Sequence, residues 1–154
     1  MRLWHYRLIP VLPNAMLVSQ WRECIAIKRQ WEKGTLKHRL VSYVMDYNKS
    51  YLSTYTNKVR IEMENRGIKH QYKYMTEIKD FSDNWYAMGF YEEHNDRYLK
   101  QCLYNLQEKA DRGIITKEEW QKIEDKFGGV MWKMGNLLFI IIQNILKILN
   151  ILHI

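Results

Sequence analysis

The chain has 154 residues, enough for one hydrophobic core, and its composition (47% hydrophobic, 27% charged) excludes a disordered or fibrous protein. Two cysteines, Cys24 and Cys102, are too few for a disulfide framework, and early charges interrupt any secretory signal, so we expect a cytoplasmic protein. The sequence contains no zinc-type His and Cys spacing, no phosphate-binding loop and no nucleophilic serine motif, so we expect neither a metal nor a cofactor.

The net charge of +7 is concentrated in the first half of the chain. Residues 1–80 hold 15 Lys and Arg against 7 Asp and Glu, a balance of +8, whereas residues 81–154 hold 9 against 10, a balance of −1. A basic half of this kind is typical of a surface that binds phosphate groups with a salt-sensitive affinity. A solvated basic face without a partner is the alternative interpretation.

Residues 2–12 are predicted to form an extended arm that lies on the protein. The two prolines, Pro10 and Pro13, argue against a central strand in this stretch. The apolar side chains expected to pack inward are Leu3, Trp4, Leu8, Ile9 and Leu12.

A first helix is predicted from residue 15 to about residue 30, with Asn14 as its N-cap, because this stretch contains neither Gly nor Pro. Glu23 lies on one face of it, where helical spacing brings a carboxylate among cations. An ordinary surface ion pair of Glu23 is the alternative. The residues that share this face with Glu23 are Arg22, Ala26 and Arg29.

A second helix is predicted from Thr35 to about Tyr47, following Gly34. Lys37, His38 and Arg39 would occupy its first turn, where the helix dipole disfavours cations, and a bound phosphate would explain that placement. The side chains predicted on its inner face are Leu36, Leu40, Val41 and Val44.

A third helix is predicted to begin at Asn48 or Ser50 and to end at Gly67, which suits the position after a helix C-terminus. Residues 68–95 follow, with aromatic side chains interleaved with lysines. Such aromatics can stack on unpaired bases, but we favour core packing with the lysine stems lying over it. The inner stripe predicted for the third helix consists of Leu52, Tyr55, Val59 and Met63.

The remaining chain predicts two more helices and an apolar end. Asn95 is expected to cap a helix over 96–110, and a capping box at 116–119 to begin another that stops at Gly128 and Gly129. Residues 137–154 form an amphipathic apolar segment, suited to packing in a groove or lying on a membrane surface.

These patterns together predict an all-α fold: a compact single-domain helical bundle with an extended N-terminal arm. Within it we expect a basic helical domain (1–95), a helical hairpin packed on that domain (96–127) and a hydrophobic amphipathic C-terminal helix (128–154).

The opening of the chain resembles a known family. The run Arg2-Leu3, Leu8-Ile9, Leu12-Pro13-Asn14, Leu17 and Trp21-Arg22-Glu23 is similar to the start of the pyrimidine-dimer DNA glycosylases of the phage endonuclease V type, and more closely to their bacterial relatives. The similarity covers roughly residues 1–70 and is strongest over 1–26. In that family the N-terminal α-amine is the nucleophile and a helix-borne glutamate is the general base. Glu23 matches that glutamate within the same aromatic-Arg-Glu triplet.

The resemblance implies the positions of the site residues, with departures. The phage enzymes lose their Met and expose Thr, whereas the second residue here is Arg, whose bulk disfavours Met removal. We therefore align Met1 with the family nucleophile and Arg2 with the arginine that follows it, which makes Arg2 a predicted contact to a DNA phosphate. Arg22 matches a family arginine that contacts substrate. The next family arginine falls on Ala26, and a family histidine falls on Met16. Further predicted DNA contacts are Lys28 or Arg29 in place of Ala26, and Lys37 and Arg39. Trp4, His5 and Tyr6 are candidates for a wedge into the duplex, although core packing is favoured for Trp4.

The chemistry implied by the resemblance suits a chain terminus. An α-amino group has a pKa near 7.7–8.0 against about 10.4 for lysine, so its neutral, nucleophilic fraction at pH 7 is roughly 300-fold larger. The sequence thus predicts a DNA repair glycosylase and AP lyase that nicks double-stranded, ultraviolet-damaged DNA at pyrimidine dimers. The alternatives are a non-catalytic DNA-binding module and a membrane-surface protein that uses residues 137–154. No oligomeric state is predicted.

Overall fold

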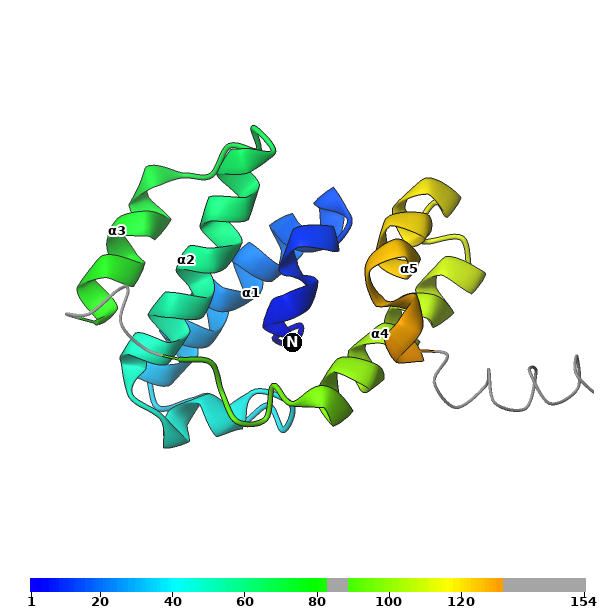
Figure 1. Ribbon diagram of the computed structural model, residues 1–154. Helices are drawn as coiled ribbons and strands as arrows, with labels where there is room; N and C mark the ends of the chain where they lie inside the picture. Colours follow the sequence, from blue (N-terminus) through cyan, green and yellow to red (C-terminus); the bar gives the residue numbers. More distant parts are fainter. Residues whose placement is uncertain (83–88, 132–154) are drawn as a thin grey trace, which may run out of the picture. The chain divides into compact units, whose positions relative to one another are not determined.

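The computed structural model describes residues 1–82 and 89–131 (Figure 1). Helices are the only regular structure in these ranges, so the all-α prediction is confirmed. The chain divides into two compact units, Met1–Cys102 and Leu103–Ile154. The finer division drawn from the sequence at residues 95 and 127 stays a prediction.

The N-terminal segment packs as predicted but is not extended throughout. Its apolar side chains are buried, whereas residues Tyr6–Val11 form a short 3-10 helix, η1. The His5 side chain caps η1 by accepting a hydrogen bond from the Arg7 N–H, and the fixed φ of Pro10 is compatible with a helical turn. The buried side chains of the segment are Leu3, Trp4, Leu8, Ile9 and Leu12.

Helix α1 spans Asn14–Glu32 and packs against α2 and α3 in the first unit (Figure 1). The predicted cap was wrong, because Pro13 occupies the N-cap position and Asn14 is already helical. The Asn14 side chain instead accepts a hydrogen bond from Arg66, at 3.0 Å, which ties the start of α1 to the end of the next long helix.

The predicted helix over 35–47 is wrong. Residues 35–41 are irregular, and only Ser42–Asp46 form a 3-10 helix, η2. This stretch is rich in Thr, His, Ser, Tyr and Val, all weak helix formers, so burial of a few apolar side chains determines its path instead. Leu40 is 50% exposed rather than on an inner face, while Leu36, Val41 and Val44 are buried.

Helix α2 spans Lys49–Asn65 and begins as predicted, since the Asn48 side chain accepts from the Ser50 N–H. Its predicted inner stripe is fully buried against α1, and Gly67 follows it with a φ of 67°. Helix α3 spans Tyr72–Phe81 and was not predicted from the sequence. It lies beside α2 (Figure 1) and also contacts α1.

Helix α4 spans Asp96–Asp111 and helix α5 spans Lys117–Met131. Asn95 caps α4 by accepting from the Tyr98 N–H, and Thr116 and Glu119 form the predicted reciprocal capping box of α5. The predicted stop at Gly128 and Gly129 was wrong, because α5 continues to Met131; a glycine in a helix costs only about 1 kcal/mol.

The apolar end predicted at 137–154 lies outside the described residues, as do Trp85 and Tyr86 of the aromatic stretch. None of the helices described is long and apolar enough to cross a membrane.

Candidate active site

The N-terminal segment is fixed through its main chain just behind the terminus. The buried Gln20 side chain, 1% exposed, accepts a hydrogen bond from the Trp4 N–H at 3.0 Å. On the other side of the same segment, the Tyr55 hydroxyl donates to the Trp4 carbonyl and the Tyr98 hydroxyl donates to the Leu3 carbonyl, both at 2.6 Å. Two side chains of α2 and α4 and one of α1 therefore hold residues 3 and 4 in place.

Glu23 lies beside the chain terminus. Its Oε2 accepts a hydrogen bond from the Arg2 N–H at 2.9 Å. Only the Cα and carbonyl carbon of Met1 separate the Arg2 nitrogen from the terminal nitrogen, so the carboxylate and the α-amine are neighbours. The Arg2 guanidinium lies over the Trp4 ring, 5.1 Å from its centroid, so this cation packs against the N-terminal segment itself. The two residues predicted to be catalytic, Met1 and Glu23, are thus brought together.

His38 is the further group at the terminus. Its Nε2 lies 3.5 Å from the Met1 nitrogen. The sequence placed His38 in the first turn of a helix and gave no sign of this contact, because residue 38 lies on an irregular segment whose path follows no periodicity. The neighbours of His38, Lys37 and Arg39, are exposed on that segment.

The predicted DNA contacts fall into two groups. Arg22, Lys37 and Arg39 are exposed, and within the described ranges they form no ion pair. Lys28 and Arg29, by contrast, are already engaged in contacts inside the protein.

Lys28 is only 7% exposed and pairs with Glu32 at 2.8 Å. Arg29 makes two hydrogen bonds to Glu77, at 3.0 and 2.7 Å, which raise the pKa of Arg29 and lower that of Glu77. Neither side chain can therefore take the place of the family arginine at position 26, where this chain has Ala26, unless the contacts inside the protein rearrange.

A cavity of about 470 Å³ opens next to Arg22. Its lining combines aromatic and cationic side chains from α1 and from residues 69–74, but includes neither Met1 nor Glu23. Trp21 forms one wall with His70, whose ring centroid lies 5.3 Å away. A hollow of this size, with planar walls and three cations, suits a flat anionic group such as a nucleotide. The cations are Arg22, Arg29 and Lys69.

The family model described as pyrimidine dimer DNA glycosylase matches residues 1–76, just under half of the chain. Residues 1–76 are therefore similar to the pyrimidine dimer DNA glycosylases. The description of that family names DNA as what its members act on. Comparison with curated proteins and with solved structures gave no match.

The matched residues, 1–76, include most of the candidate site. Met1, Glu23, His38 and the exposed cations all lie within this range, as does the whole cavity lining. Tyr98 and His94, which contact the N-terminal segment, lie beyond the matched residues.

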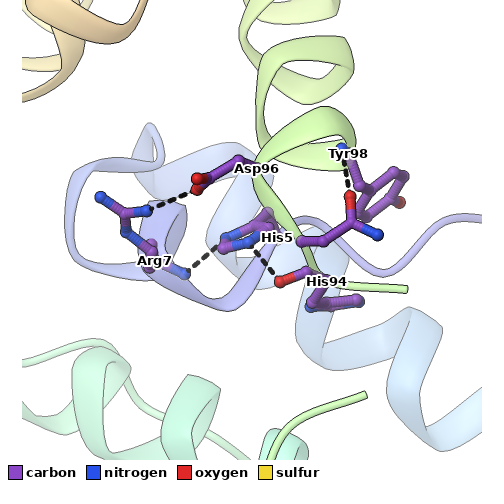
Figure 2. Close-up of polar contacts among 6 residues, drawn as sticks. His5, Arg7, His94, Asp96 and Tyr98 are labelled. Carbon is purple, nitrogen blue, oxygen red and sulfur yellow. Dashed lines mark hydrogen bonds and ion pairs between the residues drawn. The ribbon is translucent and has the colours of Figure 1, made fainter. Parts of the chain in front are cut away.

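A buried histidine pair, His5 and His94, joins the N-terminal segment to the residues just before α4 (Figure 2). His5 Nδ1 accepts from the Arg7 N–H, so its Nε2 carries the proton and donates to the His94 carbonyl at 2.8 Å. His94 Nδ1 accepts from the Tyr6 N–H, so its Nε2–H donates to the Tyr43 hydroxyl at 2.9 Å. Both rings are therefore neutral.

Desolvation explains why both imidazoles stay neutral: it lowers the pKa of His94 to about 3 and also lowers that of His5. The packing of this segment contradicts the wedge suggested for His5 and Tyr6, and it agrees with the core packing favoured for Trp4. Trp4 and His5 are 9% and 1% exposed, and the Tyr6 ring is stacked on Phe90 at 3.9 Å, so all three pack within the protein.

Proposed function

We propose that the protein is a DNA glycosylase with AP lyase activity, which acts on pyrimidine dimers in double-stranded DNA through an imine formed by the Met1 α-amine. The hydrogen bond from the Arg2 N–H to Glu23 carries the proposal, because it sets a carboxylate beside the terminal nitrogen. This is the arrangement of nucleophile and base that such a reaction requires. The proposal requires a free amine at Met1.

The two groups take successive roles. The amine attacks C1′ of the 5′ nucleotide of the dimer, the glycosidic bond breaks and an imine forms. The Glu23 carboxylate, held beside the former amine, then removes a proton from C2′ and the 3′ phosphate leaves by β-elimination. While the sugar carries positive charge, the same carboxylate stabilises it electrostatically.

The exposed cations account for duplex binding. Arg22, Lys37 and Arg39 are available for phosphates, and Arg22 also borders the cavity. Access to a damaged sugar requires distortion of the helix and expulsion of a base, which costs a few kcal/mol. The cavity provides a place for an expelled nucleotide, since its volume and its aromatic wall at Trp21 suit a base.

The test is nicking of ultraviolet-irradiated plasmid together with borohydride trapping of the imine. The wild-type protein, with a free Met1 confirmed by mass spectrometry, is expected to nick irradiated plasmid only and to be trapped on it. Glu23→Gln should lower nicking by about 10²- to 10⁴-fold while binding is retained. Chemical acetylation of the N-terminus should abolish trapping.

Glu108→Gln is the matched control, because this carboxylate is exposed on α4, and its nicking should equal that of the wild type. Equal binding to irradiated and undamaged plasmid without any nicking would show a DNA-binding module that lacks the chemistry. Trapping that survives acetylation would show that Met1 is not the nucleophile.

A further inference from the structure

We propose that His38 is the proton carrier of the reaction: it accepts a proton from the Met1 α-ammonium and later delivers it to the sugar ring oxygen. This inference rests on the proposed function. It adds a titratable residue that the predicted site, limited to Met1 and Glu23, did not contain.

The His38 imidazole is directed at the terminus, with Nε2 3.5 Å from the Met1 nitrogen. This is longer than an ordinary hydrogen bond, but catalytic contacts are often long before substrate binds. A charged terminal nitrogen can only donate a hydrogen bond. Nε2 of a neutral His38 must therefore accept, and Nδ1 must carry the imidazole hydrogen. A neutral His38 is therefore oriented to receive a proton from the ammonium.

The segment that carries His38 is fixed although the side chain is exposed. The His38 carbonyl accepts two backbone hydrogen bonds, from the Val41 N–H at 2.9 Å and from the Ser42 N–H at 3.0 Å. Leu36 and Val41, on either side, are buried and anchor the segment to the core. The imidazole is thus presented to the terminus from a firm base, as a proton carrier requires.

Charged groups surround the pair from several elements. Arg2 and the Met1 ammonium come from the N-terminal segment, and Lys37 and Arg39 from the segment of His38 itself. Glu23 comes from α1 through its contact with the Arg2 N–H. The hydroxyl of Tyr98, on α4, is close enough to Arg2 and Glu23 for their charges to act on it in opposite directions. Two positive charges 3.5 Å apart would repel each other, which favours transfer of a proton away from the pair or between its two nitrogens over charging both.

The proton balance of the reaction gives His38 two tasks. The Met1 ammonium first loses one proton to His38 Nε2, and the neutral amine then forms its bond to C1′ as the glycosidic bond breaks. The released base takes both bonding electrons and a second proton from the attacking nitrogen. The nitrogen lone pair next forms the C1′=N bond while the C1′–O4′ bond breaks. O4′ takes the proton held by His38, which leaves a protonated imine, a 4′-hydroxyl and a neutral imidazole.

The test compares single-turnover imine trapping of the wild type, His38→Ala and His38→Gln between pH 6 and pH 9, with saturating irradiated DNA. Both variants are expected to slow by about 10-fold or more at pH 6.5, where the amine needs an acceptor, and by less than about 3-fold at pH 8.5, where solvent supplies neutral amine. Added imidazole should restore the rate of His38→Ala at pH 6.5 and leave Glu23→Gln unchanged. Leu40→Ala, an exposed neighbour on the same segment, should follow the wild-type profile.

The outcomes separate this inference from the proposed function. A wild type that forms no imine overturns both. A wild type that forms the imine, with His38 variants that keep its pH profile, overturns only the role of His38. A loss that is equal at every pH and is not rescued by imidazole assigns His38 to folding or DNA binding, and so also overturns the inference.

Discussion

At the scale of single residues, the site depends on side chains that the sequence pattern did not single out. Glu23 was predicted from the resemblance carried by its aromatic-Arg-Glu triplet, and it lies beside the terminus. Gln20 and His38 were not predicted, because each contacts the N-terminal segment across many residues of chain. Periodicity reports which face of a helix is buried, but it does not report which buried polar atom meets a distant main-chain group.

Gln20→Ala is expected to loosen the terminus. The substitution leaves the Trp4 N–H buried without its acceptor, which should lower the free energy of unfolding by about 1–3 kcal/mol. Urea denaturation measures this decrease, and the rate of imine trapping should fall with it, because residue 4 would no longer be held in position. Ser19→Ala, exposed one residue earlier on α1, should change neither quantity. An unchanged stability of Gln20→Ala would show that the hydrogen bond does not hold the segment.

At the scale of elements, the sequence was most informative where a helix begins with a capping side chain. The starts of α2, α4 and α5 were predicted because Asn48, Asn95 and Thr116 make the expected hydrogen bonds. The helix predicted over 35–47 failed because its apolar spacing was mistaken for helical periodicity in a stretch of weak helix formers. Helix α3 was missed although Ile78 and Phe81 are buried, since its aromatics and lysines hid a short amphipathic repeat.

The contact between η1 and the start of α4 makes stability depend on pH. His5 and His94 are neutral in the folded protein because their pKa values are lowered, that of His94 to about 3. In the unfolded chain each histidine titrates near 6.5, so the unfolded state binds protons first as the pH falls. The stabilisation is complete above pH 6.5 and decreases progressively toward the folded-state pKa; for His94 the decrease at pH 5 is about 2 kcal/mol.

Denaturation curves at pH 7.5, 6 and 5 test this prediction. His94→Gln should be less stable at pH 7.5 but should lose less stability than the wild type on acidification. Tyr43→Phe is the matched variant, because it removes the hydroxyl that partners His94 and keeps the titrating imidazole. It should therefore be destabilised while its pH dependence stays close to that of the wild type. Equal acid sensitivity of the wild type and His94→Gln would contradict the assignment.

At the scale of the whole molecule, the uneven charge and the site lie in the same half of the chain. The +8 balance of residues 1–80 includes the exposed Arg22, Lys37 and Arg39. Charge counting locates the basic half, but it does not distinguish these cations from Lys28 and Arg29. That distinction depends on partners such as Glu32 and Glu77, which are brought close only by the folded chain.

DNA affinity is expected to fall steeply with salt and to depend on particular cations. Replacing Lys37 or Arg39 by Ala should weaken binding and reduce the slope of log K against log salt by about 1 for each phosphate that the native side chain neutralises. Lys122→Ala, an exposed cation on α5, should leave the slope unchanged. Fluorescence anisotropy with an irradiated duplex over a series of salt concentrations gives these slopes. A Lys122→Ala effect equal to that of Arg39→Ala would show diffuse attraction rather than a defined phosphate-binding face.

The hydrogen bond between the Arg2 N–H and Glu23 belongs to a position and not to an amino-acid type. Every residue except proline supplies the same N–H, so this contact with the carboxylate does not depend on which other residue stands second. A change in the number of residues ahead of Leu3 has the opposite effect, because it shifts the register and presents a different nitrogen to the carboxylate. The number of residues before Leu3 is therefore under stricter constraint than the amino-acid types of those residues.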